Sequence, residues 1–428
     1  SITIEVKRTG KESFLSKVIE LVRNAQESKS KTQDIANKAA FWLTIIAISV
    51  GALTMLVWLL FEGKEFVFAL ERTVTVMVIT CPHALGLAVP LVVAVSTAIS
   101  AQKGLLIRNR AAFEAARNLD AIIFDKTGTL TEGKFGINKI ASLDSSFSEE
   151  KLLEYAASIE TFSEHPIAKG ITESYNKKLL KVDTFQAIPG KGAKGRIENK
   201  NVMVVSPGYL KENNLVANKN DIEELFNNPN TVVFVLVNNK VVGAIELGDK
   251  IKKESKEAIK VLKDLKIKCI MITGDNKKVA EKVAQELMLD DYYAEVLPSE
   301  KAEKVNEIKR QGLKVAMTGD GVNDAPALAT ADVGIAIGAG TDVAIETADI
   351  VLVNSNPLDV VSIIKLARAT YKKMIQNLVW AAGYNIVAIP LAAGVLYNQG
   401  VLLSPAAGAL LMSLSTVIVA INAKFLKL

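Results

Sequence analysis

The residues Asp125-Lys126-Thr127-Gly128-Thr129-Leu130-Thr131 form a loop with the composition of a phosphate-handling site. The apolar run 121–124 precedes it, so we expect the Asp125 carboxylate at the end of a buried strand, aimed outward. A rigidly held carboxylate can attack phosphorus, and the backbone N–H groups and hydroxyls behind it can bind phosphate oxygens. The sequence therefore predicts phosphoryl transfer at this aspartate.

Two later apolar runs end in similar turns, Thr273-Gly274-Asp275 and Thr318-Gly319-Asp320. Phosphoryl transfer requires charge neutralisation and alignment, so we expect Thr273 to hydrogen-bond a phosphate oxygen and Lys301 to supply a positive charge. Asp320 offers hard oxygen ligands for Mg²⁺ beside the first carboxylate. Taken singly, an Asp-Gly turn is usually only a turn and a lysine is usually solvated. Their joint occurrence at successive strand ends indicates a site.

Cys81-Pro82-His83 lies inside a long apolar stretch. Proline kinks a helix, and the carbonyls it frees must be satisfied within the protein when the helix lies in a bilayer. A thiolate and an imidazole are soft ligands that suit copper or silver better than Na⁺ or Ca²⁺. The structural alternative is a buried cysteine and a hydrogen-bonded histidine, although ionisable residues inside membranes are usually functional.

Polar residues also occur in the last two apolar stretches, where packing by methionine and helix linkage by serine or threonine are the ordinary interpretations. They are Asn377, Tyr384, Asn385, Met412, Ser413, Ser415 and Thr416. Glu71 and Arg72, early in the stretch that carries Cys81, are either a mutual pair or a feature of the exit side, and the sequence does not decide between these.

The chain combines 50% hydrophobic with 23% charged residues over 428 positions, so apolar and charged residues must be segregated. Four stretches are long enough to cross a bilayer, and short polar connections join them into two hairpins. Lysine-rich and arginine-rich flanks predict a cytoplasmic location for both ends and the long middle part. Buried helices of a soluble protein are the alternative. The four stretches are 41–61, 66–101, 377–395 and 401–421.

The net charge of +5 is spread along the chain and does not indicate nucleic-acid binding. Two distant cysteines exclude a disulfide scaffold, and we expect Cys269 to be buried core. Between the hairpins, strand-like runs alternate with helix-like stretches at 277–286 and 300–310, which predicts a doubly wound parallel sheet. Strand-like segments at 202–205 and 231–237 interrupt this pattern and indicate an inserted domain.

The Asp125 loop, Thr273-Gly274-Asp275 and 318–324 together resemble the signature of the P-type ATPases on a haloacid-dehalogenase-like core. The resemblance covers essentially the whole chain. It implies an α/β phosphorylation domain with an inserted α+β nucleotide-binding domain and four transmembrane helices. It also implies ATP and Mg²⁺ as cofactors, an aspartyl phosphate at Asp125, and Mg²⁺ ligation by Asp125, Thr127 and Asp320. The implied catalytic set is Asp125, Lys126, Thr127, Thr273, Gly274, Asp275, Lys301, Asp320, Asn323 and Asp324.

The inserted domain contains Ser163-Glu164-His165-Pro166 and a later Gly-x-Gly turn. In the heavy-metal branch of the family such motifs bind the adenine end of ATP. The resemblance therefore implies that Glu160 and His165 contact adenine and that Gly190 and Gly192 allow close backbone approach. The chain departs from the family at 205–208, where Val-Ser-Pro-Gly stands in place of the usual Gly-Asn pair.

Cys-Pro-His, Tyr-Asn and Met-Ser-x-Ser-Thr resemble the copper-exporting P-type ATPase B subgroup, whereas other copper pumps carry Cys-Pro-Cys. The implied cargo is Cu(I), with Cu(II) or Ag(I) as variants, exported across the cytoplasmic membrane with the catalytic domains in the cytosol. A metallochaperone is a possible partner. The implied ligands are Cys81, His83, Tyr384, Asn385, Met412 and Ser415.

We expect a pump that lacks its upstream phosphatase loop, further spans and any metal-binding tail, because the chain opens in mid-pattern. The alternatives are a membrane-anchored phosphohydrolase without transport, a pump for another soft metal, and a metal-binding scaffold. The expected domains are the actuator end and stalk (1–40), a transmembrane hairpin (41–101), the phosphorylation domain (102–134 and 240–357), the nucleotide-binding domain (135–239), a stalk (358–376), a second hairpin (377–422) and a tail (423–428).

Overall fold

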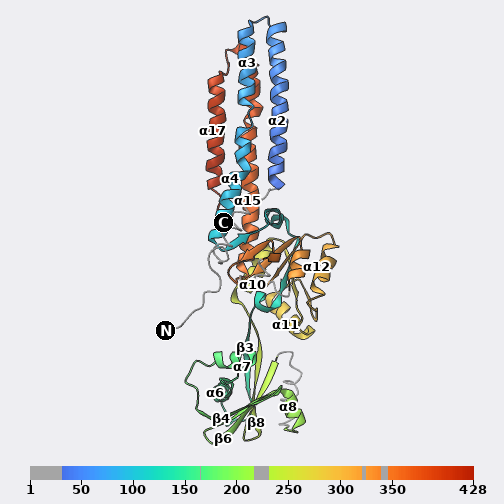
Figure 1. Cartoon of the computed structure of the whole chain (residues 1–428), viewed down its shortest axis with the longest axis vertical. Helices are drawn as coiled ribbons and strands as arrows, with labels where there is room; N and C mark the ends of the chain where they lie inside the picture. Colours follow the sequence, from blue (N-terminus) through green and yellow to red (C-terminus); the bar gives the residue numbers. More distant parts are fainter. Residues whose placement is uncertain (1–30, 164, 216–230, 321–323, 339–345) are drawn as a thin grey trace. The chain divides into compact units, whose positions relative to one another are not determined.

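The computed structural model of the chain describes residues 31–163, 165–215, 231–320, 324–338 and 346–428. It divides into two compact units, of which the first comprises Ser1–Ile122 and Ala302–Leu428 and the second Ile123–Lys301 (Figure 1). Most of the expected actuator end, and the predicted catalytic residue Asn323, lie outside the described residues.

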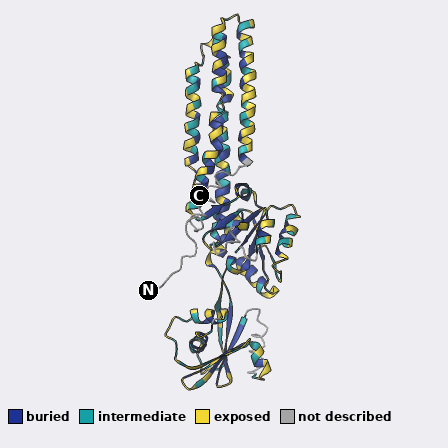
Figure 2. Cartoon of the chain, viewed as in Figure 1, coloured by how far each residue is buried: buried dark blue, intermediate teal, exposed yellow. Residues whose placement is uncertain are grey.

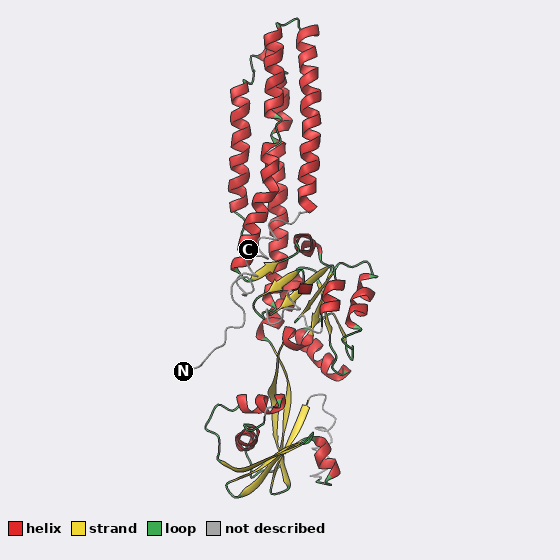
Figure 3. Cartoon of the chain, in the orientation of Figure 1, coloured by secondary structure: helices red, strands yellow, loops and turns green. Residues whose placement is uncertain are grey.

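Long apolar helices form much of the first unit (Figure 3). Four helical stretches are long and apolar enough to cross a membrane, which confirms the four predicted spans: Thr32–Phe61, Phe66–Gln102, Leu358–Ala393 and Pro405–Lys424. Their helices are α2 (Lys31–Leu56, continued by the turn Val57–Phe61), α3 (Phe66–Ile79), α4 (His83–Gln102), α15 (Leu358–Gly383), α16 (Asn385–Ala393) and α17 (Pro405–Lys424).

Local sequence explains where these helices begin and end. The break between α3 and α4 falls at Cys81-Pro82, as the proline requires. Helix α17 begins at Pro405 rather than at residue 401, because the Ser404 hydroxyl accepts a hydrogen bond from the Ala407 N–H (3.2 Å) and proline favours the first helical position. The predicted start of the fourth span was therefore wrong by one turn.

The helices bury small and aliphatic side chains against one another and expose large apolar ones. Figure 2 shows exposed residues along the outer faces of the helices, among them Trp42, Val379 and Leu410. Ala84, Leu85 and their neighbours pack inside. Exposed apolar surface of this extent is what a lipid environment would cover.

The first unit also contains strands in the order β1-β13-β12-β11. Strands β11, β12 and β13 are parallel and β1 is antiparallel to β13. Parallel neighbours require crossover connections, and short helices lie between these strands in the sequence. The elements are β1 (Leu105–Ile107), α5 (Arg110–Ala115), a turn Ala116–Asn118, α12 (Lys301–Lys309), β11 (Val315–Gly319), α13 (Ala325–Thr330), β12 (Val333–Ile337) and β13 (Ile350–Leu352).

The second unit holds the strand that ends at Asp125 and a parallel pair, β9 with β10. Strands β2 and β9 match the predicted apolar runs 121–124 and 269–272 within one residue at each end, because an apolar run that stops at an Asp-bearing turn is typical of a buried strand. Strand β10 was not predicted. The elements are β2 (Ala121–Asp125), the turn Lys126–Leu130, α10 (Lys253–Asp264), β9 (Lys268–Ile272), α11 (Lys277–Leu287) and β10 (Asp291–Tyr293).

The second unit also contains a six-stranded antiparallel sheet in the order β3-β8-β7-β6-β5-β4. Helices α6 and α7 cover one face and α8 lies on the other, each over its own apolar cluster. The elements are β3 (Thr131–Ser142), α6 (Glu149–Glu160), α7 (Pro166–Glu173), β4 (Val182–Ile188), β5 (Gly192–Ile197), β6 (Lys200–Val205), α8 (Pro207–Glu212), β7 (Thr231–Val237) and β8 (Lys240–Ile251).

Candidate functional site

Asp125 occupies the last position of β2, where the residue is 7% exposed. The Lys301 ammonium donates a hydrogen bond to Asp125 Oδ1 at 2.6 Å, and Lys301 is equally buried. Lys301 lies 176 residues away at the start of α12, so only the fold brings the pair together. A buried carboxylate that keeps one oxygen on a cation is held in a fixed direction, which suits a nucleophile.

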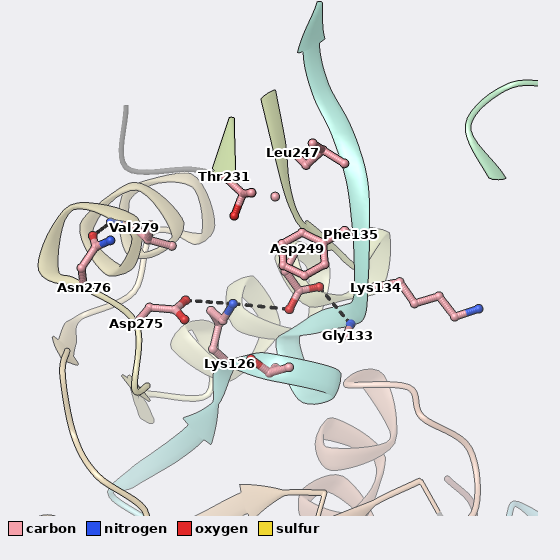
Figure 4. A pocket seen from close by; sticks show the side chains of 12 residues that line it. Lys126, Gly133, Lys134, Phe135, Thr231, Leu247, Asp249, Asp275, Asn276 and Val279 are labelled. Carbon is pink, nitrogen blue, oxygen red and sulfur yellow. Dashed lines mark hydrogen bonds and ion pairs between the residues drawn. The ribbon is translucent and has the colours of Figure 1, made fainter. Parts of the chain in front are cut away.

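Lys126, the next residue, is held between two carboxylates (Figure 4). Its ammonium lies 2.9 Å from Asp275 Oδ2 and 3.4 Å from Asp249 Oδ2. Asp249 also accepts hydrogen bonds from the Thr131 hydroxyl (2.5 Å) and the Gly133 N–H (2.9 Å). Asp249 therefore joins the end of β8 to the loop that carries the candidate nucleophile.

Lys252 also holds this loop through hydrogen bonds to its backbone. Its ammonium donates to the carbonyl oxygens of Gly128 (2.6 Å) and Thr129 (3.0 Å), and its backbone N–H donates to Leu130 O (3.1 Å). Burial lowers the pKa of Lys252 from its ordinary value. Neither Asp249 nor Lys252 was predicted from the sequence. The signal that could have found Asp249 is a Gly-Asp turn directly after the mainly apolar segment 241–247.

Lys126, Thr127 and Asp275 line a pocket of about 330 Å³ together with Asp249 (Figure 4). Thr273, at the end of β9, is 2% exposed, and its hydroxyl accepts a hydrogen bond from the Asp275 N–H at 3.2 Å. Two lysines, Lys126 and Lys134, and two carboxylates, Asp249 and Asp275, line this pocket, and Lys126 directly follows the candidate nucleophile in the sequence. Its remaining lining residues are Gly133, Phe135, Thr231, Leu247, Gly248, Asn276 and Val279.

The other predicted catalytic residues belong to the first unit. Asp320 directly follows β11, and Asp324 is 1% exposed immediately before α13. Their approach to Asp125 and the joint Mg²⁺ ligation by Asp125, Thr127 and Asp320 stay predictions. Asn323 lies outside the described residues.

A second pocket, of about 350 Å³, lies in the inserted domain and brings together all four predicted nucleotide contacts, Glu160, His165, Gly190 and Gly192. Gly192 has φ +135°, and a Cβ there would stand 2.0 Å from Val204 O, so the turn requires glycine. The imidazole of His165 accepts a hydrogen bond from the Ile167 N–H (3.3 Å), which fixes the ring at the start of α7.

The segment 205–208, which differs from the usual Gly-Asn pair of the family, also lines this pocket through Val205 and Ser206. The Ser206 N–H donates to Lys191 O at 2.8 Å, between the two turn glycines. The serine segment thus keeps the Gly-x-Gly turn in place without an asparagine. The pocket can accommodate a flat apolar ring with polar groups at its edge.

We expect Glu160 to make the protein less stable as the pH rises from about 5 to about 7. Burial raises the pKa of Glu160 to about 7, so the folded chain holds a proton across this interval that the unfolded chain has released. The unfolding free energy then falls by up to ~3 kcal/mol. Apparent melting temperatures measured from pH 5 to pH 8 should fall for the natural protein and fall less for Glu160→Gln.

The exposed Glu173 provides the matched control for this measurement. Glu173→Gln should keep the pH dependence of the natural protein. An unchanged slope in Glu160→Gln would show that the buried carboxyl is not the titrating group.

The predicted metal ligands lie in the first unit, around the break between α3 and α4. Cys81 is exposed, and the Tyr384 hydroxyl donates to Ile79 O at 3.1 Å, two residues before Cys81. Tyr384 also hydrogen-bonds Ser415 and interacts electrostatically with Cys81. The structure thus groups Cys81, Tyr384 and Ser415.

Asn385 stands out among the remaining predicted ligands. It is 2% exposed, yet within the described part of the chain neither its Nδ2 nor its Oδ1 has a hydrogen-bond partner. Burying a polar atom without a partner costs free energy of folding, so this amide is a good candidate to bind a ligand. Met412 is half-buried and His83 is exposed at the start of α4.

Over the described ranges, no three His, Cys, Asp or Glu side chains gather into a metal-binding group. A metal held near Cys81 would therefore need donors of other kinds. The hydroxyls of Tyr384 and Ser415, which the fold groups with Cys81, are donors of this kind.

Comparison with known proteins places these sites in a family. Residues 119–332 match the haloacid dehalogenase-like hydrolases. A zinc-transporting PIB-type ATPase solved in its E2.Pi state superposes with a TM-score of 0.76 at 30% identity, over 99% of this chain and 69% of that one. The chain belongs to the PIB-type ATPases.

Two sequence relatives agree with this assignment. The copper-exporting P-type ATPase B of Archaeoglobus fulgidus is 61% identical over the whole of this chain and 62% of its own length. The corresponding protein of Enterococcus hirae is 48% identical over the whole of this chain and 57% of its own length. The chain thus spans about six-tenths of the length of these relatives. The predicted P-type family, haloacid-dehalogenase-like core and multi-pass membrane location are confirmed.

Proposed function

We propose that the protein carrying this chain exports copper, as Cu(I) or the similar Ag(I), across the cytoplasmic membrane at the expense of ATP. The observation that carries the proposal is Asp125, held buried at the end of β2 with Lys301 at 2.6 Å. The names of the relatives at 61% and 48% identity support copper as the cargo.

The geometry supports phosphoryl transfer to Asp125. A carboxylate oxygen of Asp125 attacks the γ-phosphorus of ATP, the bond to the β–γ bridging oxygen breaks, and ADP leaves with that electron pair. Lys301 and Lys126 neutralise charge around the transferred group, while Lys252 keeps the loop carbonyls in place. Water then hydrolyses the aspartyl phosphate and returns Asp125 to its starting form.

The Asp125 carboxylate and the Thr127 oxygens are hard donors of the kind that Mg²⁺ prefers, and ligation of the same ion by Asp320 stays a prediction. When bound, the ion would offset the negative charge of the phosphate groups. The adenine end of ATP would occupy the pocket of Glu160 and His165, where Gly192 lets the backbone approach.

The transported ion would bind beside the helix break. Cys81 would provide a thiolate, and the buried amide of Asn385, which has no hydrogen-bond partner among the described residues, would provide an oxygen. His83, Tyr384, Met412 and Ser415 complete the proposed set. Sulfur donors favour Cu(I) or Ag(I), and delivery by a metallochaperone stays a prediction.

Transport requires two states whose balance phosphorylation shifts. The charge that appears at Asp125 would bias the catalytic domains, and α4 and α15 connect these domains to the spans in the sequence. The second candidate is a pump for zinc, favoured by the zinc-transporting relative of similar fold. The third is a phosphohydrolase without transport.

ATP hydrolysis by the purified full-length protein, measured across metals, tests the proposal. We expect stimulation by silver or by copper under reducing conditions, and none by zinc. Stimulation by zinc alone would favour the second candidate, and metal-indifferent hydrolysis the third.

A further inference from the structure

A group of side chains that the proposed mechanism does not use connects the turn of the first hairpin, between α2 and α3, with the turn of the second hairpin, between α16 and α17. We call this group the hairpin clamp: Trp58, Phe68, Arg72, Gly394 and Tyr397. Glu71 and Arg72 form the mutual pair that was one of the two alternatives left open by the sequence, at 2.5 Å.

Arg72 hydrogen-bonds the C-terminal end of the connection between α16 and α17. It is fully buried, and its Nη1 donates to Leu403 O at 2.5 Å, two residues before α17 begins. Its guanidinium also lies over the Phe68 ring, 5.7 Å from the centroid. The hydrogen bond from this buried cation to a loop carbonyl fixes the loop to α3, because loss of the carbonyl would leave a buried donor without its partner.

Trp58 hydrogen-bonds the N-terminal end of the same connection. Its indole Nε1 donates to Ala393 O, at the last residue of α16, with a length of 2.8 Å. Gly394 follows with φ +92°, and a Cβ there would stand 2.7 Å from the indole ring. Trp58, Phe68 and Tyr397 pack edge-on in pairs, with ring centroids 5.1 to 5.4 Å apart.

The clamp connects the end of the first span and α3 with the end of α16 and the loop before α17. Two of these helices, α3 and α16, lead to proposed metal ligands. Helix α3 runs from the clamp to the break at Cys81, about 13 Å beyond Arg72 at the helical rise. Helix α16 runs from Asn385 to the clamp. Val76 and Ile79 of α3 pack against Ala388 and Ala392 of α16, and Tyr384 bonds Ile79 O near the metal end.

We propose that Trp58 and Arg72 are positioning residues for the transport site. Trp58 bonds the end of α16 and packs on Phe68 of α3, while Arg72 ties α3 to the loop that follows α16. Together these contacts fix α3 against α16 and thereby the separation of the Cys81 thiolate from the Asn385 amide. This inference rests on the proposed function. Groups that orient metal ligands from outside the ligand set commonly change metal affinity about tenfold when they are lost. The tolerance for displacement is small, on the order of 0.5 Å in a preorganised site.

Gly394→Ala tests the inference with a matched control. The added methyl must displace the Trp58 ring, whereas Gly400→Ala meets the same kind of backbone strain (φ +76°) with no atom within 4 Å. In the full-length protein, we expect Gly394→Ala to raise the silver concentration for half-maximal ATPase stimulation about tenfold. The rate at saturating silver should stay close to that of the natural protein, and Gly400→Ala should leave both quantities unchanged.

Trp58→Phe provides a second, milder test, since it keeps a ring and removes only the donor to Ala393 O. A lost hydrogen bond predicts a shift of about fivefold in the same concentration. The same substitution at Trp42, which is 63% exposed, is the control and should have no effect.

Equal metal dependence in Gly394→Ala, Trp58→Phe and the natural protein would overturn the inference and leave the proposed function standing. A rate that falls at saturating silver without a change in the half-stimulating concentration would also overturn it, because that result indicates a general loss of folded protein. Absence of any silver or copper response in the natural protein would instead overturn the proposed function.

Discussion

Asp125→Asn is expected to lower metal-stimulated ATP hydrolysis by on the order of 10⁴-fold or more. An amide nitrogen or oxygen cannot take the place of the carboxylate in forming an acyl phosphate. The substitution also removes the negative charge that faces the buried Lys301 ammonium at 2.6 Å. Phosphate release from ATP by the purified full-length variant, measured at saturating silver, checks this.

The same substitution at Asp183 is the matched control, because that carboxylate is exposed and its nearest cation, Lys181, is 3.9 Å away. Asp183→Asn should hydrolyse ATP at the natural rate. The Asp125 variant must still be folded for the comparison to count, which its melting temperature shows. Hydrolysis near the natural rate in folded Asp125→Asn would contradict the assignment of the nucleophile.

Cys81→Ser is expected to raise the half-stimulating concentration of silver by more than about 100-fold, or to abolish stimulation. A hydroxyl is a hard donor and binds soft metals far more weakly than a thiolate. The loss of metal affinity should exceed that caused by changing a residue that only orients a ligand, for which about 10- to 100-fold is usual. The measurement is the silver dependence of ATP hydrolysis by the full-length protein.

Cys269 provides the control for this change. It is fully buried, and desolvation raises the pKa of its thiol to about 12, so the thiol stays protonated at neutral pH and is a poor ligand. Cys269→Ala should keep the natural silver response. If the two variants respond alike, Cys81 is not a ligand of the transported ion.

The sequence predicted those parts of the structure that depend on short-range pattern. Strand β9 was expected at 269–272 and observed at Lys268–Ile272, because a run of apolar residues ending in a polar turn defines a buried parallel strand. The spans were predicted for the same reason, since apolar length alone identifies them. The glycine turn at Gly192 was likewise evident from residue type.

Several residues that act over long separations were not predicted. Asp249 lies 118 positions from Thr131 and Lys252 124 positions from Gly128, so no local pattern links either residue to the loop it holds. Trp58 and Ala393 are 335 positions apart. In each case the contact exists only after the sheet or the helix bundle has formed.

The helix boundary at Pro405 was missed for a different reason. Residues 401–403 are apolar and continue the hydrophobic stretch, but they precede the Ser404 cap and therefore lie outside the helix. Hydropathy reports transfer to an apolar environment, whereas helix starts depend on capping hydrogen bonds. The two criteria differ by one turn here.

Phosphoenzyme labelling is the most direct test of the claim that phosphorylation of Asp125 is coupled to a soft metal ion. The full-length protein is incubated with ATP labelled at the γ-phosphate, with and without silver, and quenched in acid. The account predicts acid-stable label that increases with silver, is absent in Asp125→Asn, and no longer responds to silver in Cys81→Ser. Label that persists in Asp125→Asn, or that is indifferent to silver in the natural protein, would contradict it.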